Sequence, residues 1–289
     1  MKKKIFTIIS ASVLFLAALV MTLYPVISNY VNQKYASKIH TAYQEMIQKT
    51  DDTQLRKAKE LAAAYNNAII PGAAEESYSR ESILAASVEY DSLLNLTGEG
   101  TMGYVVIPKI HVNLPIYHGT GNDSLERGVG HLLGSSLPIG GESTHAILTG
   151  HSGMATQKMF TDLDQLKTGD VFYLQILNET LAYQVVEINT VLPYDTSLLG
   201  IVHGEDYCTL VTCTPYGVNT HRLLVRGSRI PYSEAEEIAE ESGVDEPTES
   251  TWETEYIKGI VVGILVVIAF ILFIAIFQYF FGGQDHEVA

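Results

Sequence analysis

The chain has 289 residues, and its formal net charge of -15 at pH 7 comes from 33 acidic against 18 basic side chains. Between its apolar ends it has no basic tract of the kind that binds phosphates, so nucleic acid is excluded as an expected partner. The hydrophobic fraction of 47% can form a sizeable core, which excludes a generally disordered chain.

The first element is an apolar run at the N-terminus. Lys2, Lys3 and Lys4 precede an uncharged run over residues 5–28, which is long enough to cross a bilayer and also has the charged-then-apolar order of a signal peptide. Residues 1–28 are therefore predicted to be a signal or transmembrane segment with a cytoplasmic N-terminus. No clear small-x-small cleavage site follows, which favours an uncleaved anchor, although cleavage is left open.

Two helices are predicted next. Apolar residues recur at helical spacing from Val31 to about Ile69, with a break at Thr50-Asp51-Asp52, where Asp can cap a new helix. Residues 29–70 are therefore predicted to form a helical stalk that rises from the membrane. Pro71-Gly72 ends the second helix, and residues 71–100 form a separate segment of mixed composition.

From Met102 the pattern changes to short β-rich runs separated by turn-forming residues. Strands are predicted at residues 104–107, 114–117, 144–150, 171–177, 181–192, 208–213 and 222–226. One helix is expected between Gln157 and Leu166. Short strands at this spacing, over residues 101–232, predict a mainly β domain that is either a closed barrel or a sandwich.

The C-terminal part combines an acidic stretch with a second apolar run. Residues 234–255 contain ten Asp or Glu and no Lys or Arg, so residues 233–256 are predicted to be a solvated acidic linker. The next run, residues 257–281, is predicted to be a transmembrane helix because its only strongly polar residue beyond Lys258 is Gln278. Counting the two crossings then places residues 282–289 in the cytoplasm.

The chain has only two cysteines, Cys208 and Cys213. If they share one strand, side chains five residues apart point to opposite faces, so the two should not form a disulfide. A free thiol in an exported protein suggests a reactive role for at least one of them. Cys208 is expected to be a buried structural thiol.

The strand-like run Thr209 to Cys213 is followed by a turn at residues 215–219 and a second strand that begins near Arg222. A hairpin of this kind would bring Arg222 beside Cys213. A thiol is a poor nucleophile at neutral pH unless a nearby base or cation favours its thiolate, and histidine is the usual partner. The pattern therefore predicts a catalytic cysteine that is assisted by a histidine.

Nine histidines compete for that role. His151 is favoured because it follows the strand-like run 144–150 and lies among small residues that let its side chain project from a strand end. Spacing alone leaves His118, His131 and His145 as alternatives.

Together these residues resemble the sortases. The likeness rests on Thr209-Leu-Val-Thr-Cys213 with Arg222, and on Thr149-Gly150-His151. Further segments resemble class C, the pilin-polymerising branch, and they lie at residues 102–110, 114–120, 130–131 and 213–222. The resemblance implies an eight-stranded β-barrel with short helices and an N-terminal lid, in a membrane protein of a Gram-positive cell whose catalytic domain is extracellular.

The resemblance also implies a reaction. Cys213 would attack the Thr-Gly bond of an LPxTG-like sorting signal to form a thioester acyl-enzyme, and a pilin lysine amine would resolve it. His151 would transfer the protons, and Arg222 would hold the substrate backbone or the developing oxyanion. Thr212 would help to bind the substrate. The expected partners are pilin subunits and the bilayer, with no metal and no cofactor.

One departure concerns the lid. Class C enzymes usually carry an Asp-Pro-aromatic tripeptide there, and this sequence has none. Residues 71–100 occupy the lid's position, and Tyr78 and Tyr90 are the candidates for an aromatic plug. Whether the cleft is plugged is left open.

Three other functions compete with pilin polymerisation. A housekeeping sortase would transfer its substrate to a cell-wall precursor. A hydrolytic cysteine protease would let water resolve the acyl-enzyme, but the papain-type Cys-Gly-x-Cys-aromatic segment is absent. A surface adhesin would often carry its own LPxTG-like signal before the C-terminal apolar run, and residues 245–258 contain none.

Overall fold

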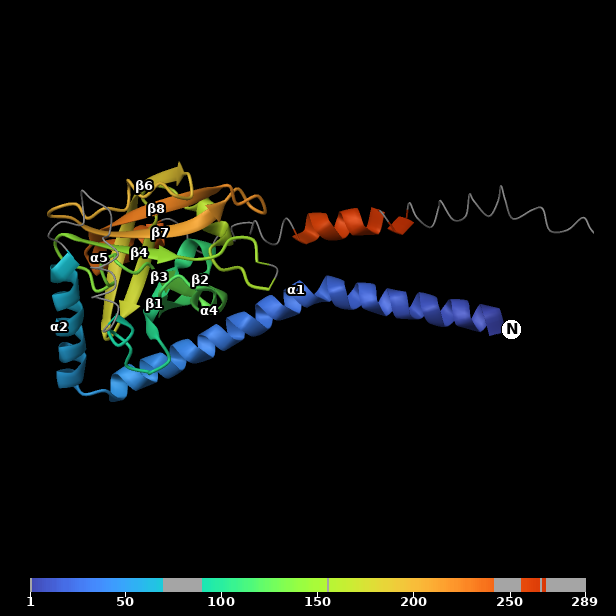
Figure 1. Cartoon of the computed structure of the whole chain (residues 1–289), viewed down its shortest axis with the longest axis horizontal. Helices are drawn as coiled ribbons and strands as arrows, with labels where there is room; N and C mark the ends of the chain where they lie inside the picture. The colour runs from blue at the N-terminus through green and yellow to red at the C-terminus, as the bar shows by residue number, and fades with distance from the viewer. Residues whose placement is uncertain (1, 70–89, 155, 242–255, 266, 269–289) are drawn as a thin grey trace, which may run out of the picture. The chain divides into compact units, whose positions relative to one another are not determined.

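The computed structural model of the chain describes residues 2–69, 90–154, 156–241, 256–265 and 267–268 (Figure 1). The chain divides into two compact units. Residues 23–248 form the larger one, and it contains the barrel. Residues 1–22 and 249–289 form the other.

The larger unit is built on a closed barrel of eight strands, in the order β1-β2-β3-β4-β7-β8-β6-β5. The strands are β1 (Thr101–Ile107), β2 (Val112–His118), β3 (Val129–His131), β4 (Thr144–Thr149), β5 (Val171–Ile176), β6 (Glu179–Val191), β7 (Asp206–Thr214) and β8 (His221–Ile230). The β2–β3 and β4–β7 pairs are parallel and the others are antiparallel. The predicted barrel is therefore confirmed, and the sandwich alternative is wrong.

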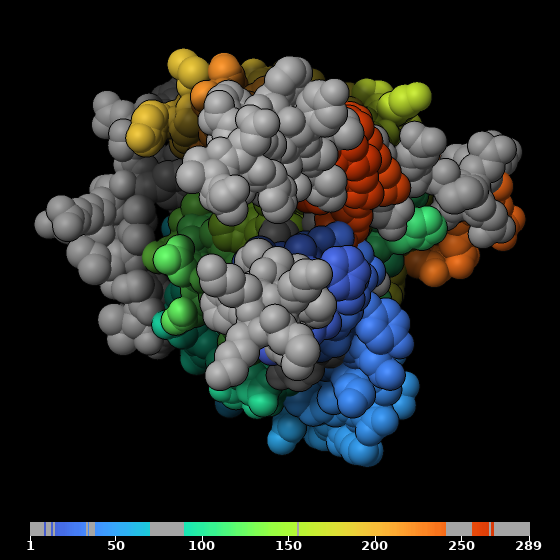
Figure 2. All heavy atoms as spheres, turned by 90° about the vertical axis from the view of Figure 1, so that its right-hand side faces the viewer, coloured from blue at the N-terminus to red at the C-terminus, as the bar shows by residue number. Residues whose placement is uncertain are grey.

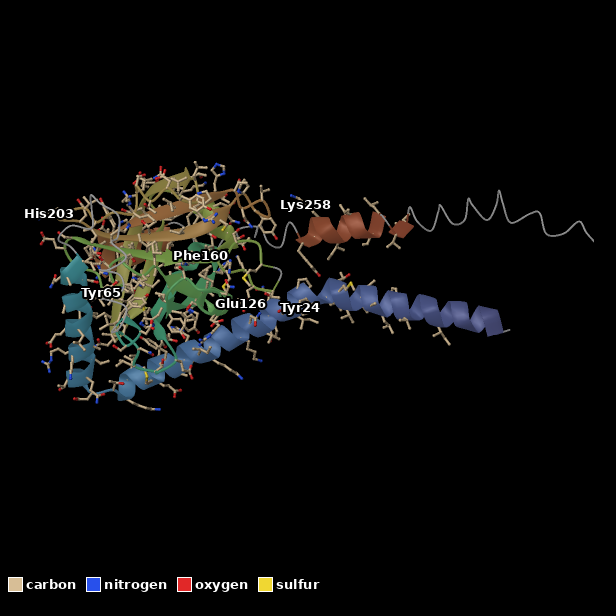
Figure 3. All side chains as sticks on the ribbon, in the orientation of Figure 1. Tyr24, Tyr65, Glu126, Phe160, His203 and Lys258 are labelled. Carbon is tan, nitrogen blue, oxygen red and sulfur yellow. The ribbon has the colours of Figure 1, made fainter. Side chains whose placement is uncertain are left out.

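The short helices connect strands or cover the barrel. They are η1 (Pro108–Ile110), α4 (Asn122–Arg127), η2 (Thr161–Gln165) and α5 (Tyr232–Glu241). The helix expected between Gln157 and Leu166 is the single 3₁₀ segment η2. Phe160, which precedes it, is fully buried in the barrel core (Figure 3).

Two helices precede the barrel, α1 (Lys2–Lys49) and α2 (Asp52–Ile69), and they break where the sequence predicts. They are not the free stalk that the sequence predicts, because the Asn29 side chain already accepts a hydrogen bond from the Lys158 amide at 3.2 Å. Tyr43, Leu55 and Tyr65 belong to the same buried cluster as the barrel interior, and Tyr65 lies between α2 and the barrel (Figure 3). The Tyr43 hydroxyl donates to the Met102 carbonyl at 3.2 Å. These helices therefore complete the core of the larger unit, and the light blue atoms of α2 lie at the lower right in Figure 2.

The acidic stretch after the barrel begins as a helix. In α5, Ala235 is fully buried in a small cluster with residues of β5 and β6, and its carbonyl accepts a hydrogen bond from the Tyr173 hydroxyl at 3.2 Å. Residues 232–241 are therefore packed on the barrel, unlike the solvated linker that the charge pattern predicts. Residues 242–255 lie outside the described residues.

One helix segment in the described part of the chain is long and apolar enough to cross a membrane. It is residues Phe15–Asn32 of α1, with a mean hydropathy of 1.3. The apolar helix Tyr256–Leu265 is shorter than a membrane span. Because residues 269–289 lie outside the described residues, the second transmembrane helix and the cytoplasmic tail stay predictions.

Candidate active site

The β7–β8 hairpin places Cys213 opposite Arg222, as the sequence predicts. The two are direct partners in the antiparallel register. The turn between the strands is closed by the Val218 and Asn219 amides, which each donate to the Pro215 carbonyl at 3.0 Å. Side chains of directly opposite residues share one face of a sheet, so the thiol and the guanidinium lie on the same face.

The Arg222 guanidinium is held by its own hairpin. Its Nη1 donates to the His221 carbonyl at 2.9 Å and to the Asn219 carbonyl at 3.2 Å. Within the described ranges no carboxylate forms an ion pair with Arg222. Among the described residues its positive charge is therefore oriented and has no counter-ion, an arrangement suited to stabilising a developing anion.

His151 follows β4 and lies near the Cys213–Arg222 pair. This strand runs parallel to β7 with Thr149 opposite Val211. The pairing continues past the strand end, since the Gly150 amide donates to the Val211 carbonyl at 3.0 Å. Continued by two residues, this register puts His151 level with Cys213 on a neighbouring strand, at a spacing of about 4.8 Å between strands. Cys213 is thus flanked by His151 and Arg222.

The backbone around His151 is fixed on both sides. A Cβ on Gly150 would lie 2.7 Å from the Phe160 ring, so only glycine allows this close approach. The Phe160 amide donates to the His151 carbonyl at 3.0 Å. The next loop lies against the β7–β8 turn, because a Cβ on Gly153 would be 3.5 Å from the Tyr216 ring.

Thr212 connects the nucleophile strand to the histidine. Its side chain is 3% exposed, and its hydroxyl donates to the Gly150 carbonyl at 2.8 Å. The residue before Cys213 is thereby tied to the residue before His151. Its predicted contact with the substrate stays a prediction.

Thr212→Val is expected to lower kcat/KM for peptide cleavage roughly tenfold, because it leaves the buried Gly150 carbonyl without its donor. Thr212→Ser keeps the hydroxyl and should retain most activity. Steady-state kinetics of both variants test this expectation. If the serine variant is as slow as the valine variant, the methyl group and not the hydrogen bond is what matters.

The two cysteines are both free, and they differ in environment as predicted. Cys208 is buried in the barrel core, and this burial raises the pKa of its thiol well above the ordinary value. Cys213 is partly exposed on the opposite face of the strand. Cys208 is therefore inert, and Cys213 is the accessible thiol.

Three other histidines that spacing left open are engaged in structural contacts. His131 and His145 are buried, and this burial lowers the pKa of each to about 4. Both ring nitrogens of His118 lie against backbone carbonyls, of Gly100 at 2.9 Å and of Leu93 at 2.7 Å. The register therefore favours His151 as the partner of Cys213.

The two lid candidates fall in different parts of the chain. Tyr78 lies outside the described residues. Tyr90 is 3% exposed, and its hydroxyl is 2.8 Å from His131 Nδ1. His131 Nε2 is 2.8 Å from the Ser136 carbonyl and must donate to it, so the neutral ring has no proton on Nδ1. Nδ1 therefore accepts a hydrogen bond from the Tyr90 hydroxyl. Tyr90 thus anchors its segment to β3, and a role as an aromatic plug stays a prediction.

Residues 105–230 match the family model described as "Sortase domain". Sortase C1 of Streptococcus agalactiae is 48% identical with a TM-score of 0.62, and the match covers 67% of this chain and 98% of that structure. Sortase C of Streptococcus pneumoniae is 43% identical with a TM-score of 0.60, over 68% and 97% of the two chains. Sortase A of S. agalactiae is 27% identical over 220 residues, which are 75% of this chain and 81% of that protein.

A partly exposed thiol flanked by a histidine and an arginine, on the face of a closed barrel, offers the groups that a cysteine transpeptidase needs. The structural relatives at 43–48% identity are class C sortases. This chain belongs to the sortase family.

Proposed function

We propose that this sortase polymerises pili by joining the threonine of one subunit's sorting signal to a lysine of the next. The observation that carries the proposal is the likeness to class C enzymes over nearly their whole length, at 48% identity for sortase C1 of S. agalactiae. The sortase C of S. pneumoniae, another of these relatives, is an enzyme with pilin substrate specificity. The geometry of the site supports the individual steps of the reaction.

In the first half-reaction the Cys213 thiolate attacks the carbonyl carbon of the Thr-Gly bond. Negative charge develops on the carbonyl oxygen, and the guanidinium of Arg222 is the group that would stabilise it. The C–N bond then breaks and a C–S bond remains. His151 gives a proton to the departing glycine amine, which would otherwise be a poor leaving group.

In the second half-reaction a lysine amine replaces the thiol. An ordinary lysine has a pKa of about 10.4, so most of it is protonated at neutral pH and it is a poor nucleophile. His151, neutral after the first step, would accept the proton of the attacking amine. The new C–N bond forms, the C–S bond breaks, and Cys213 returns to its starting state.

The proposed location is the outer face of the cell membrane of a Gram-positive cell. The apolar window Phe15–Asn32 supports an N-terminal anchor, and the lysines that precede it favour a cytoplasmic N-terminus. The second predicted span, residues 257–281, would hold the chain at its other end. We further propose that residues 71–100 gate entry to the cleft as a lid.

The test is a product analysis with the full-length enzyme in detergent and an LPxTG-like peptide, with and without a candidate pilin. A threonine-lysine isopeptide that forms at the expense of the hydrolysed peptide is the expected result. If only the hydrolysed peptide appears with every acceptor, the chain acts as a protease. If only a cell-wall precursor amine is joined, it is a housekeeping-type sortase. In cells, loss of the protein should replace the high-molecular-weight pilin ladder with monomers.

A further inference from the structure

The connection between β6 and β7, residues 192–205, folds over the barrel face that carries the active site. Leu198 and Leu199 pack against a small buried apolar cluster, separate from the barrel core, formed by Ile147, Val211 and Leu224. Val211 pairs with Leu224 two residues before the Cys213–Arg222 pair. Because side chains alternate along a strand, both pairs share one face. The connection therefore lies next to Cys213 and Arg222, on the same face of the sheet.

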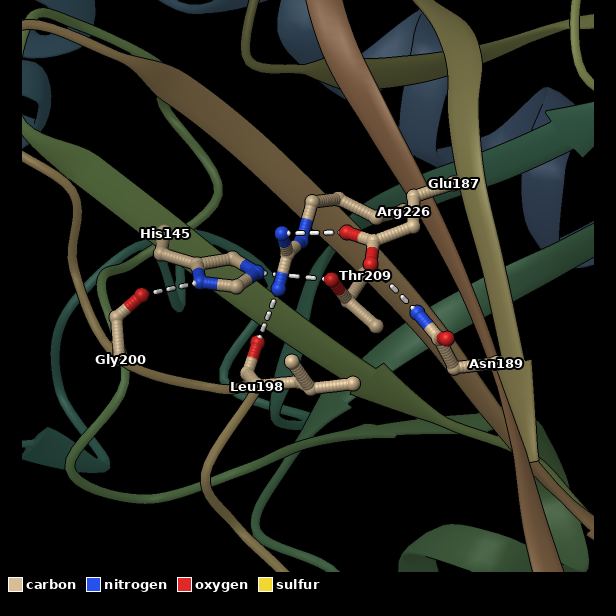
Figure 4. A network of polar contacts seen from close by, with 7 residues as sticks. All are labelled: His145, Glu187, Asn189, Leu198, Gly200, Thr209 and Arg226. Carbon is tan, nitrogen blue, oxygen red and sulfur yellow. Dashed lines mark hydrogen bonds and ion pairs between the residues drawn. The ribbon is translucent and has the colours of Figure 1, made fainter. Parts of the chain in front are cut away.

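The connection is clamped at Leu198 by Arg226 of β8. One guanidinium nitrogen, Nη2, donates to the Leu198 carbonyl, and Nη1 forms an ion pair with Glu187 of β6 at 2.6 Å (Figure 4). The guanidinium also lies over the Tyr207 ring, 5.2 Å from its centroid. Arg226 thus ties the connection to three neighbouring strands of the barrel.

A second clamp holds Gly200 through His145 of β4. The Gly200 carbonyl is 2.8 Å from His145 Nδ1, and Thr209 Oγ1 is 2.7 Å from Nε2 (Figure 4). A carbonyl can only accept, so Nδ1 carries the proton and Nε2 accepts from the Thr209 hydroxyl. His145 is 1% exposed, and its lowered pKa of about 4 agrees with a neutral ring. The second clamp therefore persists at neutral pH.

The two clamps act together on the same face as the nucleophile. Thr209 pairs with Arg226, and this pair lies two residues before Val211–Leu224 along β7. Three successive residue pairs of β7 and β8 thus lie along this face. They are Thr209–Arg226 in the clamps, Val211–Leu224 in the apolar cluster, and Cys213–Arg222. Residues 198–200 are fixed by backbone carbonyls, so their position does not depend on the side chains that a substrate would meet.

We propose that His145 and Arg226 are positioning residues that hold residues 198–200 as a preformed wall of the substrate cleft and thereby set the affinity for the sorting signal. The proposal rests on the proposed transpeptidase function. A wall that is ordered before binding spares the substrate the entropy cost of ordering it. Neither residue touches the reacting atoms, so the clamp acts on KM and leaves the chemical step unchanged.

The test compares Arg226→Met and His145→Phe with the full-length wild-type enzyme, using an LPxTG-like peptide and an amine acceptor. Each variant removes the donor while keeping a side chain of similar size. KM is expected to rise about tenfold, as for the loss of one well-placed hydrogen bond, with kcat within about twofold. His145→Asn keeps an N–H near the position of Nδ1 and should recover part of the affinity.

Two further readouts separate positioning from general damage. Hydrogen exchange of the Asp195, Ser197 and Leu199 amides should become faster in both variants, while labelling of Cys213 by a small methanethiosulfonate should proceed at the wild-type rate. Lys109→Met is the matched control, because it removes a partly buried ion pair with Asp170, at 2.8 Å, elsewhere on the barrel. It should leave KM and the loop amides unchanged.

An unchanged KM in Arg226→Met and His145→Phe would overturn the proposal, and so would a raised KM without faster exchange in residues 195–199. The same rise in Lys109→Met would also overturn it, because general destabilisation would then explain the effect. If the wild-type enzyme turns over no peptide with any acceptor, the proposed function fails. In that case the hydrogen-exchange rates of residues 195–199 alone test whether His145 and Arg226 hold the connection in place.

Discussion

Cys213→Ala is expected to reduce transpeptidation and thioester formation to background while leaving the fold intact. A methyl group cannot form a thioester, and the residue is partly exposed, so the substitution should change the free energy of unfolding by less than about 1 kcal/mol. Mass spectrometry of the enzyme with a sorting-signal peptide would show the acyl adduct only in the wild type. Thermal unfolding would verify that the variant is folded.

Cys208→Ala provides the matched control, because it removes the other thiol from the same strand. Cys208 lies in the barrel core, so this variant should lose some stability to a small cavity and keep most of its activity. If Cys213→Ala still polymerises pilin, or if Cys208→Ala is the inactive variant, the assignment of the nucleophile is wrong.

Arg222→Ala and His151→Ala are each expected to lower kcat/KM about 10²-fold or more, for different reasons. Without Arg222 the oxyanion loses its charged donor, and without His151 the leaving amine loses its proton source. Arg222→Lys should also be poor, since an ammonium cannot reproduce a planar guanidinium that is held by the hairpin carbonyls of Asn219 and His221.

The pH dependence of the reaction separates these two roles. The His151 variant should lose the limb of the rate profile that reports the proton-transfer group, whereas the Arg222 variants should keep the profile and lower its height. A small external imidazole is expected to rescue His151→Ala in part. Near-normal kinetics in either alanine variant would remove that residue from the site.

Local patterns were sufficient to predict two of the three proposed catalytic residues. Cys213 and Arg222 belong to one hairpin, so the turn residues between two β-branched runs predict their pairing. His151 reaches Cys213 through the parallel β4–β7 pairing, which joins segments about 60 residues apart in sequence. No local pattern reports such a pairing, and the residues alone therefore left His118, His131 and His145 open.

The fold was predicted to a similar depth. Seven strands were recognisable from their β-rich composition and from the turn-forming residues between them. The eighth, β3, has only three residues, which are too few to show a periodicity. The helical spacing around Tyr43 and Ile47 predicts an apolar face but not what covers that face, so the contact of α1 with the barrel was missed. In α5 the acidic run concealed Ala235, which is buried in the cluster, and Ile238 and Ala239, which pack against it.

Closure of the barrel restricts how an extended peptide can bind. Every strand already has two neighbours in the closed order, and the paired stretches of its backbone are hydrogen-bonded to them. An added full-length strand would have to displace one of these neighbours, so we expect a sorting signal to be recognised chiefly through side chains and connecting loops.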